Sequence, residues 1–260
     1  MSDRQLLAYL PRGSRLLAPL FVLFLAAIGG SLFFQPESGD AQGVPSTGMV
    51  SVKVTNLTNG IYFTPLLVSA HDGATHLFQP GQAASLGLQK MAEGGNIADL
   101  LASLGGADAD TIDNPASGLL APGGSTTAML DTSGTGNTHL SIVAMLLPTN
   151  DGFVGLDGLE LPTEQGTYVY YIHAYDAGTE ANDEIIVPGA GAPGQAGIPA
   201  DPGSTAGSGA TGVAVADDNT TIHIHRGVIG DSNPTGGASD LDPSVHRWLN
   251  PIARVVITVN

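Results

Sequence analysis

The sequence predicts an all-β protein, an antiparallel sandwich or barrel, and three observations lead to that prediction. Short apolar runs recur along the chain, and turn residues such as Gly, Pro, Asn and Asp separate them. The 36 glycines and 17 prolines suit many turns and short strands better than long helices. Hydrophobic residues make up 42% of the chain, which is ordinary for a globular protein and too many for a disordered one.

The N-terminal 41 residues have the pattern of an export signal. Three arginines fall within the first 15 residues, an uncharged apolar run follows, and small residues then offer a cleavage point after Ala41. An uncleaved membrane anchor is the alternative, because the apolar run of residues 16–34 is close to the minimum of about 17–20 residues that spans a bilayer. Either outcome places the remainder outside the cytoplasm, so we expect a secreted, periplasmic or cell-surface protein.

The segment after the signal, residues 42–260, begins and ends with good strand candidates. In residues 49–55 three valines alternate with polar residues, which is typical of a half-buried strand. Residues 252–259 alternate in the same way, so a single domain closed by its two ends is the simplest plan. The other strand candidates are 61–70, which Pro65 favours as an edge or bent strand, 126–130, 138–147, 167–175 and 220–227.

Residues 82–105 form the one predicted helical zone, with one or two short helices. Four apolar residues between 97 and 104 have the spacing of a single helical stripe. Asn96 suits the N-cap of this helix and Gly105 the position just after its last turn. Residues 82–93 are the candidate for a short preceding helix.

A segment rich in Gly, Pro and Ala interrupts the strand candidates at residues 188–212. Such a composition buries too little apolar surface to offset the entropy lost on ordering. The chain that follows it is too short for an independent sandwich. We therefore expect a flexible insertion within one domain and not a boundary between two.

Charge and cysteine content narrow the classes of partner. The net charge is −16 with a pI near 4.4, and such a surface repels nucleic acid and anionic lipid while it favours cations. The absence of cysteine excludes disulfides, thiolate nucleophiles and cysteine-based zinc sites. We expect no nucleic-acid partner, and contact with a membrane only through residues 16–34 if the leader is not cleaved.

Four carboxylates and no basic residue occupy residues 175–184, YDAGTEANDE. This segment continues from an aromatic strand candidate, and Asp151 follows another apolar strand. If the two strands point the same way, Asp151, Asp176 and Glu180 converge at one end of the domain. Clustered carboxylates repel one another, by about 1 kcal/mol for a pair 4 Å apart in bulk water and by several times that near a protein surface. A solvated acidic loop is one interpretation, and a bound calcium ion, which takes oxygen ligands, is the other.

Other residues of the two loops fit a role around such an ion. Gly178 permits a tight turn between Asp176 and Glu180. His173 does not make this a zinc site, because a separation of three residues points it and Asp176 to opposite faces of a strand. The side chains that could add oxygen atoms or supporting hydrogen bonds are Asn150, Thr179, Asn182 and Asp183.

Several motifs together resemble the spondin domain, in the version found in bacterial exported proteins. They are SVKVTNLT, HLFQPGQAAS, LLPTNDGFVGLDG, YDAGTEANDE and RWLNPIARVVITV, and the resemblance runs from about residue 50 to residue 260. It implies a β-sandwich of C2-like topology with a calcium ion at the loop tips. The ligand positions of the family fall on Asp151, Asp176 and Glu180, the last of which is more commonly Asp. Animal members act in extracellular matrix and cell adhesion.

We therefore expect an exported calcium-binding module that acts in extracellular or cell-surface binding and adhesion, toward an extracellular protein or carbohydrate, and not in catalysis. A metal-assisted hydrolase of a glycan or ester is one alternative, with Asp183 or Glu184 as the general base. A self-associating surface or biofilm structural protein is the other.

Overall fold

The structure, a computed structural model, describes residues 48–213 and 219–260. The predicted export signal, its cleavage point and the candidate membrane span therefore lie outside the described residues. Every described residue belongs to the unit Gln42–Asn260. Within that described part, no helix has the length and apolar character needed to span a bilayer.

The regular structure of this unit is mostly antiparallel strands, which confirms the predicted all-β class. The strands follow the order β4-β3-β6-β7-β8-β10-β1-β5, with β2 added beside β6 and β9 beside β8. At the two ends of this order, the Asp131 backbone N–H donates to the Asp110 carboxylate, so the sheet is nearly closed. The strands are β1 (Met49–Asn56), β2 (Tyr62–Phe63), β3 (Leu67–His71), β4 (Asp110–Asp113), β5 (Ser125–Asp131), β6 (His139–Leu147), β7 (Gly152–Glu160), β8 (Gly166–Asp176), β9 (His223–Ile224) and β10 (Ala253–Val259).

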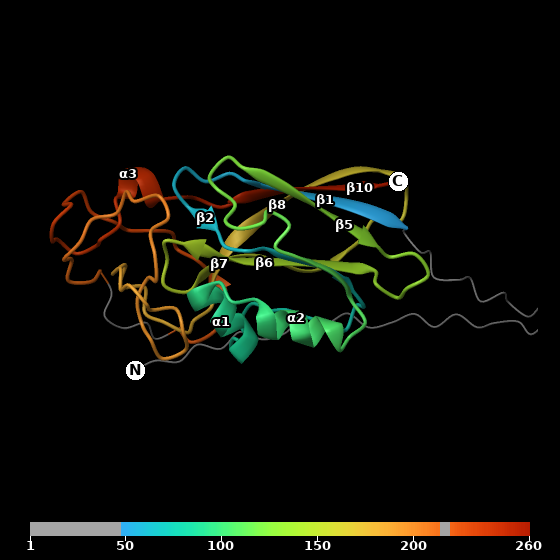
Figure 1. Cartoon of the computed structure of the whole chain (residues 1–260), viewed down its shortest axis with the longest axis horizontal. Helices are drawn as coiled ribbons and strands as arrows, with labels where there is room; N and C mark the ends of the chain where they lie inside the picture. Colours follow the sequence, from blue (N-terminus) through green and yellow to red (C-terminus); the bar gives the residue numbers. More distant parts are fainter. Residues whose placement is uncertain (1–47, 214–218) are drawn as a thin grey trace, which may run out of the picture. The chain divides into compact units, whose positions relative to one another are not determined.

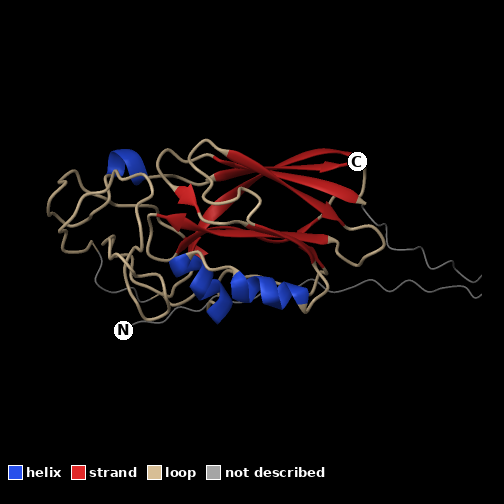
Figure 2. Cartoon of the chain, viewed as in Figure 1, coloured by secondary structure: helices blue, strands red, loops and turns tan. Residues whose placement is uncertain are grey.

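Strand β8 belongs to both layers of the fold. Its residues 166–172 pair with β10, and its residues 173–176 pair with β7. Figures 1 and 2 show the result, with β10, β1 and β5 in one layer and β6 and β7 in a second layer that faces it. The main core lies between these layers. There Val52 is paired with Ile257, and Val54 with Val255, all fully or almost fully buried.

A second apolar core lies on the other side of β6 and β7, under two short helices in the predicted helical zone. Helix α1 (Leu86–Gly94) and helix α2 (Ala98–Gly105) cover this face (Figure 1). Buried residues of both helices pack against buried residues of β6 and β7, and each such side chain contributes roughly 1.5–3 kcal/mol of burial free energy. A third helix, α3 (Pro243–His246), precedes β10.

Both predicted ends of α2 need correction, and at the first of them the reason is that Asn96 takes part in the end of α1. Gly95 adopts a left-handed conformation with φ of 69°, and the Asn96 backbone N–H donates back to the Lys90 carbonyl, which closes α1. The N-cap of α2 is accordingly Ile97, although the Asn96 side chain accepts a hydrogen bond from Ala98 N at 3.0 Å. Gly105 is the last residue of the helix and not the residue after it.

Strand assignment from the sequence is wrong at several places. Strands β4 and β7 are not predicted, segment 61–70 divides at Pro65 into β2 and β3, and only His223–Ile224 of segment 220–227 forms a strand. Strand β7 escapes prediction because its glycines have low strand propensity. The structure explains one of them, since a Cβ at Gly155 would lie 2.6 Å from the Phe78 ring.

The Gly-, Pro- and Ala-rich segment 188–212 forms loops with isolated bridges and no helix or strand. Backbone hydrogen bonds anchor it, including those from Val187 N to Ile198 O at 2.9 Å and from Ile198 N to Ile185 O at 2.8 Å. Its predicted flexibility stays a prediction. The backbone of Gly191 in this segment packs directly on the end of α1, because a Cβ at Gly94 would lie 1.9 Å from the Gly191 carbonyl oxygen.

We predict that Gly94→Ala destabilises the domain by about 1–3 kcal/mol, because the added methyl group must displace the Gly191 backbone. Gly105→Ala is the matched control at the end of the neighbouring helix, where a Cβ meets no atom within 4 Å. We expect that change to be neutral or stabilising by up to about 1 kcal/mol. Denaturant unfolding midpoints measure both, and equal stability of the two variants would contradict the packing described.

Candidate metal site

The sheet topology brings the ends of β6 and β8 to one edge. Because β7 pairs antiparallel with both strands, β6 and β8 run in the same direction. Asp151 immediately precedes β7. Asp176 is the last residue of β8, whereas the strand predicted from the sequence ends one residue before it. Gly152 is paired with Asp176, and the Ala177 backbone N–H donates to the Asp151 carbonyl at 3.2 Å. The two aspartates are therefore neighbours across the strand ends.

Three aromatic rings form a rigid base beneath these strand ends. Phe153 of β7 is paired with Tyr175 of β8, and their ring centroids are 5.6 Å apart in a stacked arrangement. Phe78 completes the group, with its centroid 5.0 Å from Phe153 and 4.9 Å from Tyr175. Such contacts fix the positions of the residues just after them, Asp176 included.

Asp151 is fully buried and only one of its carboxylate oxygens has partners. Oδ2 accepts hydrogen bonds from Thr179 N at 2.8 Å, from the Thr179 hydroxyl at 3.2 Å and from Glu180 N at 3.2 Å. Oδ1 is buried and has no hydrogen-bond partner. An unpartnered buried carboxylate oxygen is costly and needs an explanation, such as an ion that binds there.

Asp176 is 1% exposed, and the loop that follows folds back on it. Oδ1 accepts from Gly178 N at 2.8 Å, and Oδ2 accepts from the Asn182 amide at 2.6 Å. His223 Nε2 lies 3.7 Å from Oδ2. Gly178 has φ of 69°, and a Cβ there would lie 2.8 Å from the Thr221 backbone, so this turn requires glycine.

Glu180 is less buried than the two aspartates, and both of its carboxylate oxygens lie near one donor. Gly197 N is 3.2 Å from Oε1 and 3.3 Å from Oε2. The structure thus brings Asp151 and Asp176 together and places Glu180 at the margin. In residues 48–213 and 219–260, no three His, Asp or Glu side chains already form a group able to hold a metal ion.

The electrostatics of the site reflect burial of like charges. Burial and the charge of Asp176 raise the pKa of Asp151 to about 7, against the hydrogen bonds from Thr179 and Glu180. Burial likewise raises the pKa of Glu180 to about 8. Hydrogen bonds from Asn150 and Gly197 lower the Glu180 pKa, while the charges of Glu93 and Asp151 raise it further.

Glu93 is the acid near this site that sequence reasoning missed. It lies on helix α1 and is 1% exposed. Helical spacing in residues 82–93 gives no signal that a glutamate at the end of the helix is buried. The only hint in the sequence is that Gln89 stands four residues before it, at the spacing of a side-chain pair.

The predicted supporting side chains all make hydrogen bonds within these loops. Besides the bonds from Thr179 and Asn182, the Asn150 amide donates to Asp183 Oδ1 at 2.9 Å and its Oδ1 accepts from Glu184 N at 3.2 Å. The Glu184 carboxylate is 4% exposed and accepts three hydrogen bonds, from Ile229 N, Gly230 N and the Ser239 hydroxyl. Glu184 thereby holds two loops together inside the protein.

The residues present fit a hard cation. The atoms available as metal ligands are carboxylate oxygens, which calcium prefers. One of them, Asp151 Oδ1, has no hydrogen-bond partner. A cation bound there would favour the ionised forms whose pKa values are now raised. In such a site Asp151 and Asp176 would be the residues to hold the ion, and Glu180 would need to turn from Gly197.

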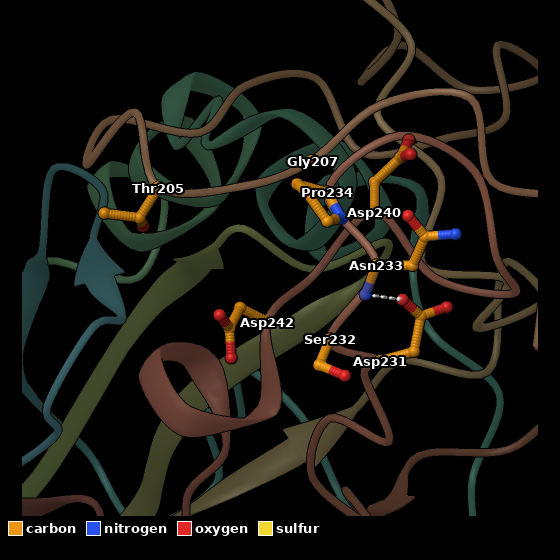
Figure 3. Close-up of a pocket in the computed structure, with 8 residues that line it drawn as sticks. All are labelled: Thr205, Gly207, Asp231, Ser232, Asn233, Pro234, Asp240 and Asp242. Carbon is orange, nitrogen blue, oxygen red and sulfur yellow. Dashed lines mark hydrogen bonds between the residues drawn. The ribbon is translucent and has the colours of Figure 1, made fainter.

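A second acidic pocket differs in its electrostatics. Figure 3 shows this cavity of about 40 Å³, which Asp231, Asp240 and Asp242 line, with the hydrogen bond from Asn233 N to Asp231. Backbone N–H groups bond all three carboxylates. Hydrogen bonds lower the pKa of Asp231 and of Asp242. These carboxylates accept hydrogen bonds from the protein itself, so their charge is stabilised without a bound cation.

A family model described as Spondin_N matches residues 55–192, just over half of the chain, and this range contains Asp151, Asp176 and Glu180. It also contains Glu93. No curated protein matches the chain.

We predict that, in the presence of a chelator, Asp151→Asn gains stability relative to the wild type as the pH rises from 6 to 8. The pKa of Asp151 is about 7 in the folded protein and near 4 in the unfolded chain, so its protonation stabilises the fold at low pH and that contribution is lost as the pH passes 7. Melting temperatures of both proteins measure the difference. Asp231→Asn is the control, because its lowered pKa keeps it ionised throughout this range. A constant difference between Asp151→Asn and the wild type would contradict the prediction.

Proposed function

The chain belongs to the Spondin_N family, and from this premise we propose that it is an exported module whose domain binds one calcium ion through Asp151, Asp176 and Glu180. The spondin domain is typical of extracellular proteins. Residues 1–41, with their arginines and apolar run, supply the export signal in this proposal. The module acts by binding an extracellular protein or carbohydrate in adhesion.

The observation that carries the proposal is the buried Oδ1 of Asp151, which lacks a partner beside a second buried carboxylate. Two like charges that are buried near one another are tolerated in a folded protein when protons or a cation neutralise them. Extracellular fluids commonly contain calcium at concentrations that suit modules with dissociation constants of about 10⁻⁴–10⁻³ M. Calcium would supply the positive charge and accept the free oxygen as a ligand.

The residues of this chain prepare the site by holding the carboxylates in place. Thr179 fixes Oδ2 of Asp151 and leaves Oδ1 available, while Asn182 and Gly178 fix the two oxygens of Asp176. Calcium takes six to eight oxygen ligands, so backbone carbonyls and water would complete the shell. The bound ion would tie the ends of β6 and β8 together and present a fixed surface to a partner.

Binding is favoured over catalysis because the candidate general bases have other roles. Glu184 is buried under three donors, and Asp183 Oδ1 accepts from Asn150 and from Ile185 N. A metal-assisted hydrolase needs a base that is free to take a proton.

Self-association would show as a calcium-dependent increase in particle mass in light scattering.

We predict that calcium raises the melting temperature of the full chain and that Asp176→Asn abolishes the rise. Calcium at 100 times its dissociation constant stabilises the folded state by about 2.7 kcal/mol, which corresponds to roughly 5–10 °C for a domain of this size. Glu160→Gln is the matched control, because it removes one exposed carboxylate at the far end of β7. Differential scanning calorimetry with calcium and with chelator measures the rise.

Two results would count against the calcium proposal. One is a wild-type melting curve that is the same in chelator and in millimolar calcium. The other is an equal calcium-dependent rise in Asp176→Asn and in the wild type, which would place the ion elsewhere.

A further inference from the structure

Helix α1 carries a buried carboxylate that its own surroundings do not satisfy. Glu93 is 1% exposed, and its Oε1 accepts one hydrogen bond, from the Gln89 amide at 2.8 Å. Its Oε2 is buried without a hydrogen-bond partner. Glutamate is almost never fully buried unless it is paired. The single amide donor leaves both the charge and one oxygen of Glu93 without a counterpart.

No basic side chain neutralises Glu93 in the part of the chain that the structure describes. The nearest candidate in sequence, Lys90 on the same helix, pairs with Asp99 at 2.6 Å. This is the one ion pair of a lysine or arginine found in residues 48–213 and 219–260. A proton or a bound cation is therefore needed to neutralise Glu93.

The same segment of backbone connects Glu93 with the candidate metal site. A Cβ at Gly191 would lie 2.9 Å from the Glu93 carbonyl oxygen, so the two backbones are in contact. Gly191 N donates to the Gln195 carbonyl at 3.3 Å, and Gly197, two residues further, donates to the Glu180 carboxylate. The charge of Glu93 also acts on the Glu180 carboxyl group.

Two buried carboxylate oxygens thus lack partners among the described residues. Glu93 Oε2 is one and Asp151 Oδ1 is the other, and Glu180 interacts electrostatically with both residues. A coincidence of two such oxygens around one acidic loop is uncommon, because a few per cent or fewer of buried polar groups lack a partner. One cation near Glu180 would satisfy both.

We propose that Glu93 is a further calcium ligand, so that the ion joins helix α1 to the loops after β6 and β8. The proposal rests on the calcium site proposed above and adds a fourth carboxylate to it. The ion would then link the helical layer to the strand ends and not only one loop to another. To share the ion with Glu93 and Asp151, Glu180 would have to turn away from Gly197.

Isothermal titration of the full chain with calcium tests this with two changes at one position. Glu93→Gln keeps the shape and the Gln89 contact but removes the charge, and we expect affinity to fall about 10-fold or more. Glu93→Asp keeps the charge but withdraws the oxygens by one methylene, and we expect a clear loss there too. Glu160→Gln is the charge control and should bind as the wild type does.

Three other outcomes of the titration would each overturn a stated part of the proposal. No binding by the wild type overturns the calcium site and this inference with it. Loss of binding in Asp176→Asn with wild-type affinity in both Glu93 variants overturns only the role of Glu93. Wild-type affinity in Glu93→Asp with weakening in Glu93→Gln also overturns it, because Glu93 would then act through long-range charge and not as a ligand.

A second measurement separates ligation from a merely structural role. Hydrogen exchange of residues 86–94 should slow on addition of calcium in the wild type and stay unchanged in Glu93→Gln. In chelator, Glu93→Gln should melt at or above the wild-type temperature, because it removes an unpaired buried charge. Equal slowing in both proteins would contradict the link between the ion and α1.

Discussion

Two carboxylates buried side by side are the constraint around which one end of this molecule is organised. Strand β7 fixes the direction and register of β6 and β8, and this brings the backbone of Asp151 beside that of Asp176. Neither aspartate meets a lysine or arginine in the described chain. The surrounding loop makes a left-handed turn at Gly178 and donates hydrogen bonds to the two carboxylates from Thr179 and Asn182.

Two acidic regions of the same protein show why composition alone does not identify a metal site. Around Asp231 the chain turns backbone N–H groups toward each carboxylate, and the pKa of Asp231 is lowered. At the ends of β6 and β8, burial outweighs the donors, and the pKa of Asp151 is raised. A carboxylate with sufficient donors is a structural anchor, whereas one without them needs a proton or a cation.

The sequence was informative where a pattern has a short-range physical cause. Alternation predicts β1 and β10, and the argument from strand direction predicts that Asp151 and Asp176 meet. Strand β7 could not be predicted, because it holds three glycines, and the close approach of the Phe78 ring that explains one of them, Gly155, arises only in the fold. Glu93 could not be predicted either, since helical periodicity does not distinguish a buried glutamate from an exposed one. Both failures concern contacts between residues distant in the chain.

The pairing of the first strand with the last also fixes which way the acidic end points. Val50 is paired with Val259, and Val259 with Gly166, so both termini of the described domain lie where β8 begins. Asp176 is at the opposite pole, where β8 finishes. If the segment before Met49 is held at a surface, the loops that carry the two buried aspartates lie at the pole of the domain farther from that attachment.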